Sequence, residues 1–333
     1  MADRMAGCSP AAHLPAPVPL SASSLPFART ERTGLGITLI LAAATGFSLL
    51  DSTVKYVGAF VPLLIVVWVR YAVQTGVMGL WLGLRGGRAN FRVAHPSFQV
   101  LRATLLLSTS VLAFLGLRAM PVAEFTAVVM LAPVMVTLLS PLLLRERVSA
   151  LRWALVLLAF AGGLLVVRPG SGVFGAGAIY PLLVAVAGAL FQIVTRRMAS
   201  LEAPLTTHFC TGLVGALLMT LALPFSPTPL LPALADATPW HWGLMLLAGL
   251  FGTFGHLAFI HAVGVAPMAV LMPFTYAQIA CAALLGALVF AHVPDGWALV
   301  GMGVIAASGA LSVWLNMRGA PQAVVAVDTT LGD

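Results

Sequence analysis

The fold of this chain is decided by residues 119–169, which read AMPVAEFTAVVMLAPVMVTLLSPLLLRERVSALRWALVLLAFAGGLLVVRP. Two long apolar runs flank a short charged elbow. No charged residue lies between Glu124 and Arg145, or between Arg152 and Arg168. Runs of this length and polarity approach the roughly twenty residues that cross a bilayer. They predict membrane-spanning helices rather than core helices of a soluble domain.

A related pattern returns between Ala266 and Val313, where small residues, an apolar run with Pro273, an elbow and a Gly-rich run follow in the same order. The tetrapeptide Trp-Ala-Leu-Val stands at 153–156 and again at 297–300. An internal repeat of this length predicts a molecule of two similar halves that face each other.

Two tails enclose the expected repeats, which we place at residues 35–168 and 174–316. The tail at 1–34 is rich in Pro, Ala and Ser and lacks the basic-then-apolar pattern of a signal peptide. It is therefore expected to be a disordered cytoplasmic tail. The tail at 317–333 has the same character.

The composition agrees with a membrane protein. Hydrophobic residues make up 60% of the 333 residues and charged residues only 8%, whereas a typical soluble domain carries about 25% charged residues. The excess of 17 Lys and Arg over 10 Asp and Glu is better explained by cationic cytoplasmic loops than by nucleic-acid binding. The cysteines Cys8, Cys210 and Cys281 lack metal-ligand spacing and are expected to act as small hydrophobic residues.

Ten apolar spans are expected, each near the length that crosses the hydrocarbon core. They lie at 35–56, 61–83, 97–118, 121–144, 152–168, 174–195, 205–224, 240–263, 266–290 and 297–316. With a cytoplasmic N-terminus, only Lys55, Arg118 and Arg168 are cations at outer ends. The positive-inside rule then places both termini in the cytoplasm. Because five spans per half is an odd number, the second half is inverted relative to the first, as in alternating-access carriers.

Weak motifs recur in a fixed order along these spans. Those of the first half are Asp51-Ser-Thr-Val-Lys55, Arg70-Tyr71, Glu124 after Pro121-Val-Ala, Pro133, Glu146-Arg147-Val148, Trp153, Gly162 and Gly163. Those of the second half are Pro273-Phe-Thr-Tyr276-Ala-Gln278, Gly286, Phe290, Pro294-Asp295, Gly301, Gly303 and Gly309. With this ordered set, the chain resembles the drug/metabolite transporter superfamily over about residues 35–316, specifically proteins with two EamA-type domains. The elbow acid of that family stands as Glu146 in the first half but is replaced by His292 in the second.

The resemblance implies an all-α integral membrane protein with ten transmembrane helices in two inverted five-helix repeats. It also implies a secondary transporter of the bacterial inner membrane, without a cofactor, whose substrate path lies between the halves. The motif subset is similar to riboflavin and S-adenosylmethionine uptake proteins and also to exporters of amino acids and other metabolites. Substrate, direction, coupling to protons and the choice between monomer and homodimer stay open.

Two other functions compete with small-molecule transport. A lipid flippase of the same superfamily is an alternative, since the sequence does not exclude a groove that faces lipid. An intramembrane enzyme is disfavoured, because the chain has no His-Glu-x-x-His, Gly-x-Ser-x-Gly or Walker A motif. We therefore expect a small-molecule substrate and the lipid bilayer as partners, and neither catalysis nor nucleic-acid binding.

Charged residues inside the first two spans are the first candidates for the substrate path. Asp51 and Lys55 are four residues apart and share a helix face, and Arg70 lies near mid-depth of the second span. Most intramembrane charges line cavities or functional pathways. The alternative is an ion pair of Asp51 with Lys55 or Arg70 that only fixes helix packing.

In the second half, the expected path residues are Gln192, His256, Tyr276 and Gln278. An aromatic ring and an amide near mid-depth would suit a flat organic solute, and core packing is the alternative for both side chains. Glu146 and His292 are expected to act as gate or elbow residues rather than as solute ligands. No metal site is expected, because His256 and His261 are about 140° apart around a helix.

The remaining polar residues carry simpler expectations. Arg102 is expected to extend to the cytoplasmic headgroups, and Glu124 and Arg118 to face water. Two series of small residues, one around Gly212 and one around Gly252, are expected to form packing seams. The fifth and tenth spans, which are almost uncharged, are expected at the periphery.

Overall fold

The broken fourth and ninth spans give this chain its most distinctive local structure. The computed structural model describes residues 32–86, 91–143, 150–168, 175–198, 201–266 and 268–319, all within one compact unit. Over these ranges the chain forms helices and no strand, so the all-α expectation is confirmed. The elements are α1 (Thr33–Val57), α2 (Leu63–Gly86), α3 (Pro96–Ala119), α4 (Val122–Val129), α5 (Ala132–Leu143), α6 (Ala150–Val167), η3 (Gly175–Ala178), α7 (Ile179–Met198), α8 (Pro204–Ala222), η4 (Leu223–Phe225), α9 (Leu230–Ala235), α10 (Pro239–Val265), α11 (Met268–Thr275), α12 (Ala277–Phe290) and α13 (Gly296–Gly319).

The fourth span is divided into α4 and α5, and the ninth into α11 and α12. Pro133 stands at the second position of α5, where its missing N–H has no helical partner to lose. Pro273 lies inside α11, and the helix breaks three residues later at Tyr276. Although the two prolines are out of register, α4 and α11 have the same length of eight residues. The two halves are therefore broken at the same point.

Among the described residues, seven helices are long and apolar enough to cross a membrane. Shorter apolar helices, at Val122–Val136, Trp153–Val167 and Gly296–Ser312, fall on the three remaining expected spans. A multi-pass membrane protein is thereby supported, whereas a total of ten crossings stays a prediction.

Helix packing follows a twofold pattern. If each span is replaced by the span five places later in the chain, the packed pair α1 and α10 becomes α7 and α3, which also pack together. In the same way, α2 with α10 becomes α8 with α3, and α1 with α12 becomes α7 with α5. The pairs α2 with α8 and α6 with α13 map onto themselves, and so does the pairing of the fourth span with the ninth, which is made through α4 and α12. This is the pattern that two structurally related repeats produce.

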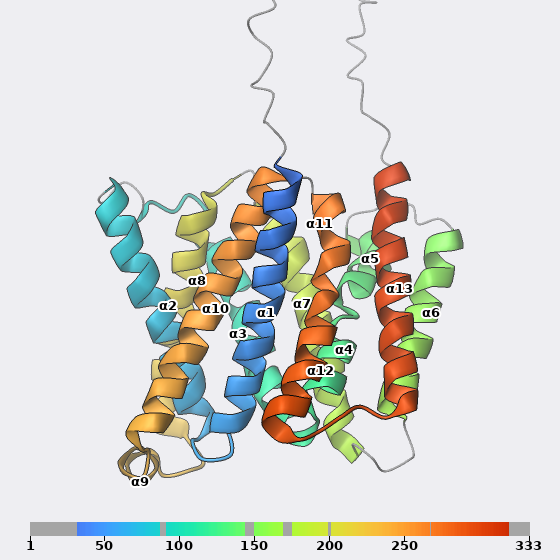
Figure 1. Ribbon diagram of the computed structural model, residues 1–333. Coiled ribbons are helices and arrows are strands. Elements are labelled where there is room, and N and C mark those ends of the chain that lie inside the picture. Colours follow the sequence, from blue (N-terminus) through green and yellow to red (C-terminus); the bar gives the residue numbers. More distant parts are fainter. Residues whose placement is uncertain are drawn as a thin grey trace, which may run out of the picture. The chain divides into compact units, whose positions relative to one another are not determined.

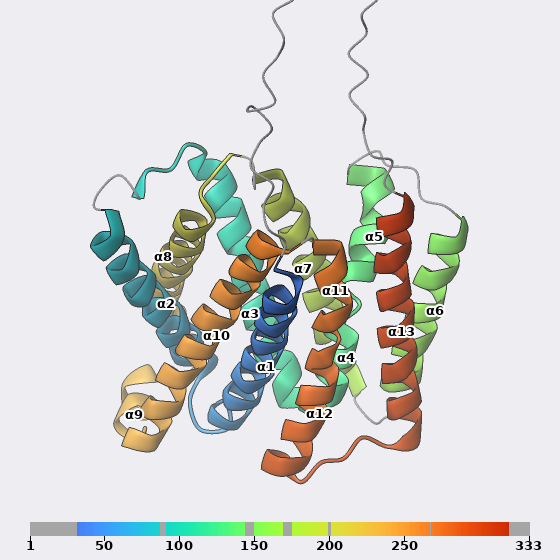
Figure 2. The same cartoon turned by 45° about the horizontal axis from the view of Figure 1, so that its top comes forward.

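Reciprocal glycines hold α6 and α13 together. A Cβ on Gly162 would lie 2.9 Å from the carbonyl oxygen of Gly301, and a Cβ on Gly301 would lie 2.6 Å from that of Gly162. Only glycine permits so close a helix approach. In both views α6 and α13 lie side by side at one edge of the helical unit (Figures 1 and 2). This arrangement agrees with a peripheral position for the fifth and tenth spans.

The first turn of α1 and the last turn of α13 lie at the same end of the helical unit, and α9 lies at the opposite end (Figure 1). We refer to the end with α9 as the outer end, following the orientation expected from the distribution of arginines. Loops at that end join α1 to α2, α3 to α4 and α12 to α13.

Candidate functional site

Arg70 lies in the middle of the helical unit, where α2, α3 and α10 meet. Its side chain is 7% exposed, and its guanidinium donates a hydrogen bond to the hydroxyl of Ser110 on α3. The hydroxyl of Tyr71 is 2.9 Å from the same Ser110 oxygen. Gly252 on α10 provides the space, because a Cβ there would lie 3.1 Å from Nε of Arg70. Arg70 is thus a buried cation, and its position at mid-depth of the membrane stays a prediction.

Asp51 lies on the face of α1 that points into the helical unit. The residue is half-buried and shares this face with Phe47, Ser48 and Lys55, given helical spacing. Within the described part of the chain its carboxylate forms no hydrogen bond and no ion pair within 4.0 Å. Arg70 on α2 nevertheless acts on this carboxylate electrostatically from beyond that distance. The pair is therefore a long-range electrostatic one.

Lys55 does not pair with Asp51. Its ammonium group donates to the carbonyl oxygens of Leu117, at 2.5 Å, and Met120, at 2.8 Å. These carbonyls lie at the end of α3, where helical C=O groups lack intrahelical partners and the helix dipole favours a cation. An ion pair between Asp51 and Lys55 is therefore not seen, and Lys55 instead caps the C-terminal end of α3.

Two histidines from different helices stack beside Arg70. The rings of His208 on α8 and His256 on α10 are 5.5 Å apart between centroids, with an angle of 24° between their planes. Nδ1 of His256 is 2.8 Å from the carbonyl oxygen of Gly252, to which it donates. The amide of Gln74 on α2 donates to the His208 carbonyl at 2.9 Å and lies 3.3 Å from its Nδ1. Neutral His208 then carries its proton on Nε2, and this buried atom has no partner among the described residues.

The seams around these histidines agree with the expectation from small residues. A Cβ on Gly212 would lie 3.0 Å from Thr75 of α2, and a Cβ on Gly215 would lie 2.5 Å from the ring of Tyr71. On α10, a Cβ on Gly249 would lie 2.7 Å from Val73. α2 is thus packed between two glycine-lined helices.

Arg102 does not reach the headgroups, and the expectation that it extends to the membrane surface is wrong. The side chain is 5% exposed and turns inward between α7 and α8. Its Nε donates to Thr195 at 2.8 Å, and its Nη1 donates to Thr211 at 2.5 Å. The guanidinium also lies 4.5 Å from the centroid of the Phe191 ring. The hydrogen bonds to hydroxyl groups on α7 and α8 replace the hydration that the guanidinium would have among the headgroups.

Glu124 is also buried, although it was expected to face water. Its Oε1 is 2.8 Å from Nε2 of His292, and its side chain is 4% exposed. Beside this pair, Arg168 and Asp295 form an ion pair at 2.6 Å. Both contacts join the first half of the chain to the second at the outer end. Arg118 is exposed, as expected.

The backbone after α12 explains why His292 reaches Glu124. Ala291 adopts a left-handed conformation with φ of 51°, and the N–H of His292 donates to the carbonyl of Gly286 at 3.0 Å. These are the features of a helix C-cap that reverses the chain direction. Asp295 stands directly before α13, and its carboxylate accepts a hydrogen bond from the N–H of Ala298. This hydrogen bond and the contact with Arg168 lower the pKa of Asp295. The other expected elbow residue, Glu146, lies outside the described residues.

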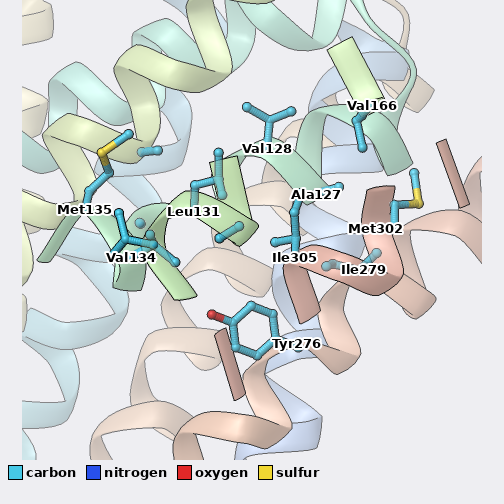
Figure 3. Close-up of a cluster of buried hydrophobic side chains, with 14 of the residues drawn as sticks. Ala127, Val128, Leu131, Val134, Met135, Val166, Tyr276, Ile279, Met302 and Ile305 are labelled. Carbon is cyan, nitrogen blue, oxygen red and sulfur yellow. The ribbon is translucent and has the colours of Figure 1, made fainter. Parts of the chain in front are cut away.

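Tyr276 lies in an apolar cluster rather than beside the charged residues. Tyr276 belongs to the buried apolar cluster drawn in Figure 3, together with Leu131, Val134 and Ile305. A Cβ on Gly309 of α13 would overlap the Tyr276 hydroxyl. This hydroxyl is buried without a partner among the described residues.

The remaining expected path residues are not brought into one cluster. The carbonyl of Gln278 accepts a hydrogen bond of 3.1 Å from Ser48, and its side-chain amide forms no hydrogen bond within the described ranges. Gln192 is half-buried on α7, and His261 is exposed. No group of three or more His, Cys, Asp or Glu that could hold a metal ion occurs among the described residues.

A family model now decides the identity of the fold. The model described as the EamA-like transporter family matches residues 34–168 and 175–314. The chain belongs to the EamA-like transporter family. The resemblance drawn from the sequence motifs is therefore confirmed.

Members of known function cover most of this EamA-like chain. A riboflavin transporter of Vibrio cholerae is 27% identical over 82% of this chain and 91% of its own length. An S-adenosylmethionine uptake transporter of Rickettsia prowazekii is 23% identical over 78% and 86%, respectively. A pseudopaline exporter of Pseudomonas aeruginosa is 26% identical over 80% and 91%. A crystal structure with 22% identity aligns with a TM-score of 0.59 over 86% of this chain and 97% of its own, which supports the fold alone.

These findings establish a small-metabolite membrane transporter and do not favour a lipid flippase. Family and relatives point to transport rather than to catalysis. They also support a multi-pass protein of the bacterial inner membrane.

Proposed function

We propose that the protein is a secondary transporter that carries a small organic metabolite across the inner membrane by alternating access. The solute is of the riboflavin, S-adenosylmethionine or amino-acid type. Both termini face the cytoplasm, and the path runs between the two halves, along α1, α2, α3, α7, α8, α10 and α12. The observation that carries this proposal is the pair Arg70 and Asp51 within the membrane-spanning helices α2 and α1, a cation and a carboxylate that are not in contact.

Energetics support a functional role for this pair. A charged side chain at the bilayer centre costs about 3 kcal/mol on insertion scales and roughly 10 or more in simulations. Arg70 is 7% exposed, and its hydrogen-bond partner among the described residues is a neutral serine. Asp51 remains half-buried and unpaired within 4.0 Å. A purely structural ion pair would bring the two groups into contact, whereas separated charges leave room for a solute or a proton.

The contacts at the outer end support a gate. Glu124 with His292, and Arg168 with Asp295, each join one half of the chain to the other. Alternating access requires that such contacts between repeats form and break as one half moves against the other. His292 is thus proposed as a gate residue, with Glu124 as its partner. Asp51 is proposed to carry a coupling proton, because its protonation changes the net charge of the path.

Counterflow in proteoliposomes tests the proposal. Vesicles loaded with unlabelled riboflavin or S-adenosylmethionine should take up the matching labelled solute faster than protein-free vesicles, for at least one of the two. An imposed proton gradient should then raise accumulation, and a protonophore should abolish the increase. Equal uptake by folded protein and empty vesicles for both solutes would contradict transport of this substrate class.

A further inference from the structure

Arg102 is a buried cation without a carboxylate partner in the part of the chain that the structure describes. It stands six residues after Pro96, the first residue of α3, and therefore about 9 Å into the helix at 1.5 Å per residue. Glu202, the acidic residue of the α7–α8 loop, is engaged elsewhere. Its Oε1 accepts hydrogen bonds from the backbone N–H groups of Ala94 and His95, at 2.9 and 2.7 Å.

The groups that hold Arg102 are all neutral. The hydroxyl of Thr195 accepts a hydrogen bond from Nε at 2.8 Å, and that of Thr211 accepts one from Nη1 at 2.5 Å. The carbonyl oxygen of Thr207 lies 3.4 Å from Nη1. The Phe191 ring packs against the guanidinium face. These contacts fix the plane of the guanidinium on one side. Its Nη2 forms no hydrogen bond to any described residue, and a guanidinium fork binds carboxylate and phosphate groups through such free N–H groups.

A second unpartnered donor lies on α8, the helix that carries Thr207 and Thr211, two of the hydrogen-bond partners of Arg102. His208 is one turn from Thr211 on α8, is 1% exposed, and has a buried Nε2 without a hydrogen-bond partner among the described residues. The carbonyl of Thr253 is a potential acceptor near this ring but lies outside hydrogen-bond geometry. The amide of Gln74, which donates toward Nδ1, leaves the proton of neutral His208 on Nε2. Two donors therefore lack acceptors in one region.

Charge balance points the same way. A buried charge is unfavourable unless a counter-charge and hydrogen bonds compensate it. Arg70 has Asp51 as an electrostatic partner, whereas, among the described residues, no carboxylate is recorded as acting on the charge of Arg102. The counter-charge that Arg102 lacks within the described residues is what a bound anion would supply.

We propose that Arg102 and His208 form an anion-binding subsite in the inner half of the path, which takes the carboxylate or phosphate of the transported solute. This inference rests on the proposed transport function and narrows its substrate class to anionic solutes. Gln99, whose Oε1 is buried without a partner among the described residues, supplies an acceptor for a hydroxyl or ammonium group beside the anion. An uncharged solute leaves Arg102 uncompensated and is bound more weakly.

Binding of matched solute pairs tests the subsite. Purified protein in phosphatidylcholine nanodiscs is titrated with riboflavin 5′-phosphate against riboflavin, and with S-adenosylmethionine against its methyl ester. In wild type, the anionic member of at least one pair should bind about 10- to 100-fold more tightly than its partner, the range for a hydrogen bond to a charged group. Arg102→Gln should abolish that difference and leave the affinity for the other member unchanged.

Three further proteins keep the test decisive. Arg118→Gln removes an exposed arginine of the same helix and should bind like wild type. Arg102→Lys retains the charge without the fork and should keep part of the preference. If Arg102→Gln does not fold, Phe191→Leu, which removes the stacking partner, should weaken anion binding several-fold. Equal affinities within both pairs, or an unchanged preference in these variants, would overturn the subsite.

The same measurements distinguish a solute subsite from a lipid site and from a failure of transport. If phosphatidylglycerol in the nanodisc, and no soluble anion including inorganic phosphate, stabilises the protein in an Arg102-dependent manner, the ligand is a lipid headgroup and the proposal fails. If riboflavin is transported without preference for its phosphate, the transport function stands and the anion subsite fails. If anions bind through Arg102 but no solute is transported in proteoliposomes, the transport function alone fails.

Discussion

Oε1 of Glu124 and Nε2 of His292 are 2.8 Å apart, and this hydrogen bond joins the start of α4 to the loop after α12. The two residues come from different halves of the chain, 168 positions apart. Glu124 lies in the first turn of α4, and His292 directly follows the left-handed C-cap of α12. A contact of this kind can close the outer end in one conformation and release it in another.

We expect strong coupling between these two residues. Glu124→Gln and His292→Ala should each lower the melting temperature, and a double-mutant cycle should give a coupling energy of about 1–3 kcal/mol, as for a hydrogen bond to a charged group. The other contact between the halves, Arg168 with Asp295, has side chains that are 30% and 49% exposed and serves as the comparison. Its coupling should be smaller, because water screens an exposed ion pair. A coupling at Glu124 and His292 no larger than that of the comparison pair would contradict the gate contact.

Asp51 and Lys55 should behave independently. Lys55 donates to the carbonyls of Leu117 and Met120 rather than to Asp51. Asp51→Asn and Lys55→Gln should therefore destabilise additively, within about 0.5 kcal/mol. An interaction energy well above that value, measured by unfolding in detergent, would contradict this and support an ion pair between Asp51 and Lys55.

Substitutions at Gly309 and Tyr276 should not be additive, unlike those at Asp51 and Lys55. Gly309→Ala places a Cβ on the Tyr276 hydroxyl and should destabilise by about 1–3 kcal/mol, the usual range for overpacking. Tyr276→Phe removes that unpartnered hydroxyl and should recover part of the loss. Gly303→Ala, with no neighbouring atom within 4 Å of the new Cβ, should be tolerated or stabilising. Equal effects of the two glycine substitutions on the melting temperature would refute the close packing.

The left-handed turn after α12 offers a stabilising substitution. Ala291→Gly should raise stability by about 1 kcal/mol, because glycine adopts positive φ without a steric penalty. Ala280→Gly, at an exposed position within α12, should instead lower it by about 0.5–1 kcal/mol. A loss of stability in Ala291→Gly would mean that the turn is not held in this conformation.

Sequence patterns predicted the helices well and the partners of charged side chains poorly. The spans, the broken helices and the glycine seams depend on composition and local spacing, which are visible in the chain. Arg102 and Glu124 were misplaced because both lie near the end of a span, where extension into headgroups or water is the simplest expectation. Their burial depends on Thr195, Thr211 and His292, which are distant in sequence.

One further signal in the sequence was available. Gln74 lies four residues after Arg70 and therefore on the same face of its helix. A second buried polar group at that spacing would have directed attention to the facing helix that carries His208, with which Gln74 forms its hydrogen bonds. Spacing along a helix identifies a polar face, but the helix that covers this face is determined by tertiary packing.

Solute uptake by Asp51→Asn tests the central claim most directly. Proteoliposomes with wild type, Asp51→Asn, or Asp236→Asn, which alters an exposed carboxylate of the outer loop, are compared at matched protein content and confirmed fold. Asp51→Asn should fold and insert, yet carry solute at least about tenfold more slowly, equivalent to about 1.4 kcal/mol in the barrier. Asp236→Asn should transport like wild type. Wild-type uptake kinetics in folded Asp51→Asn would contradict a substrate path through the separated charges of Asp51 and Arg70.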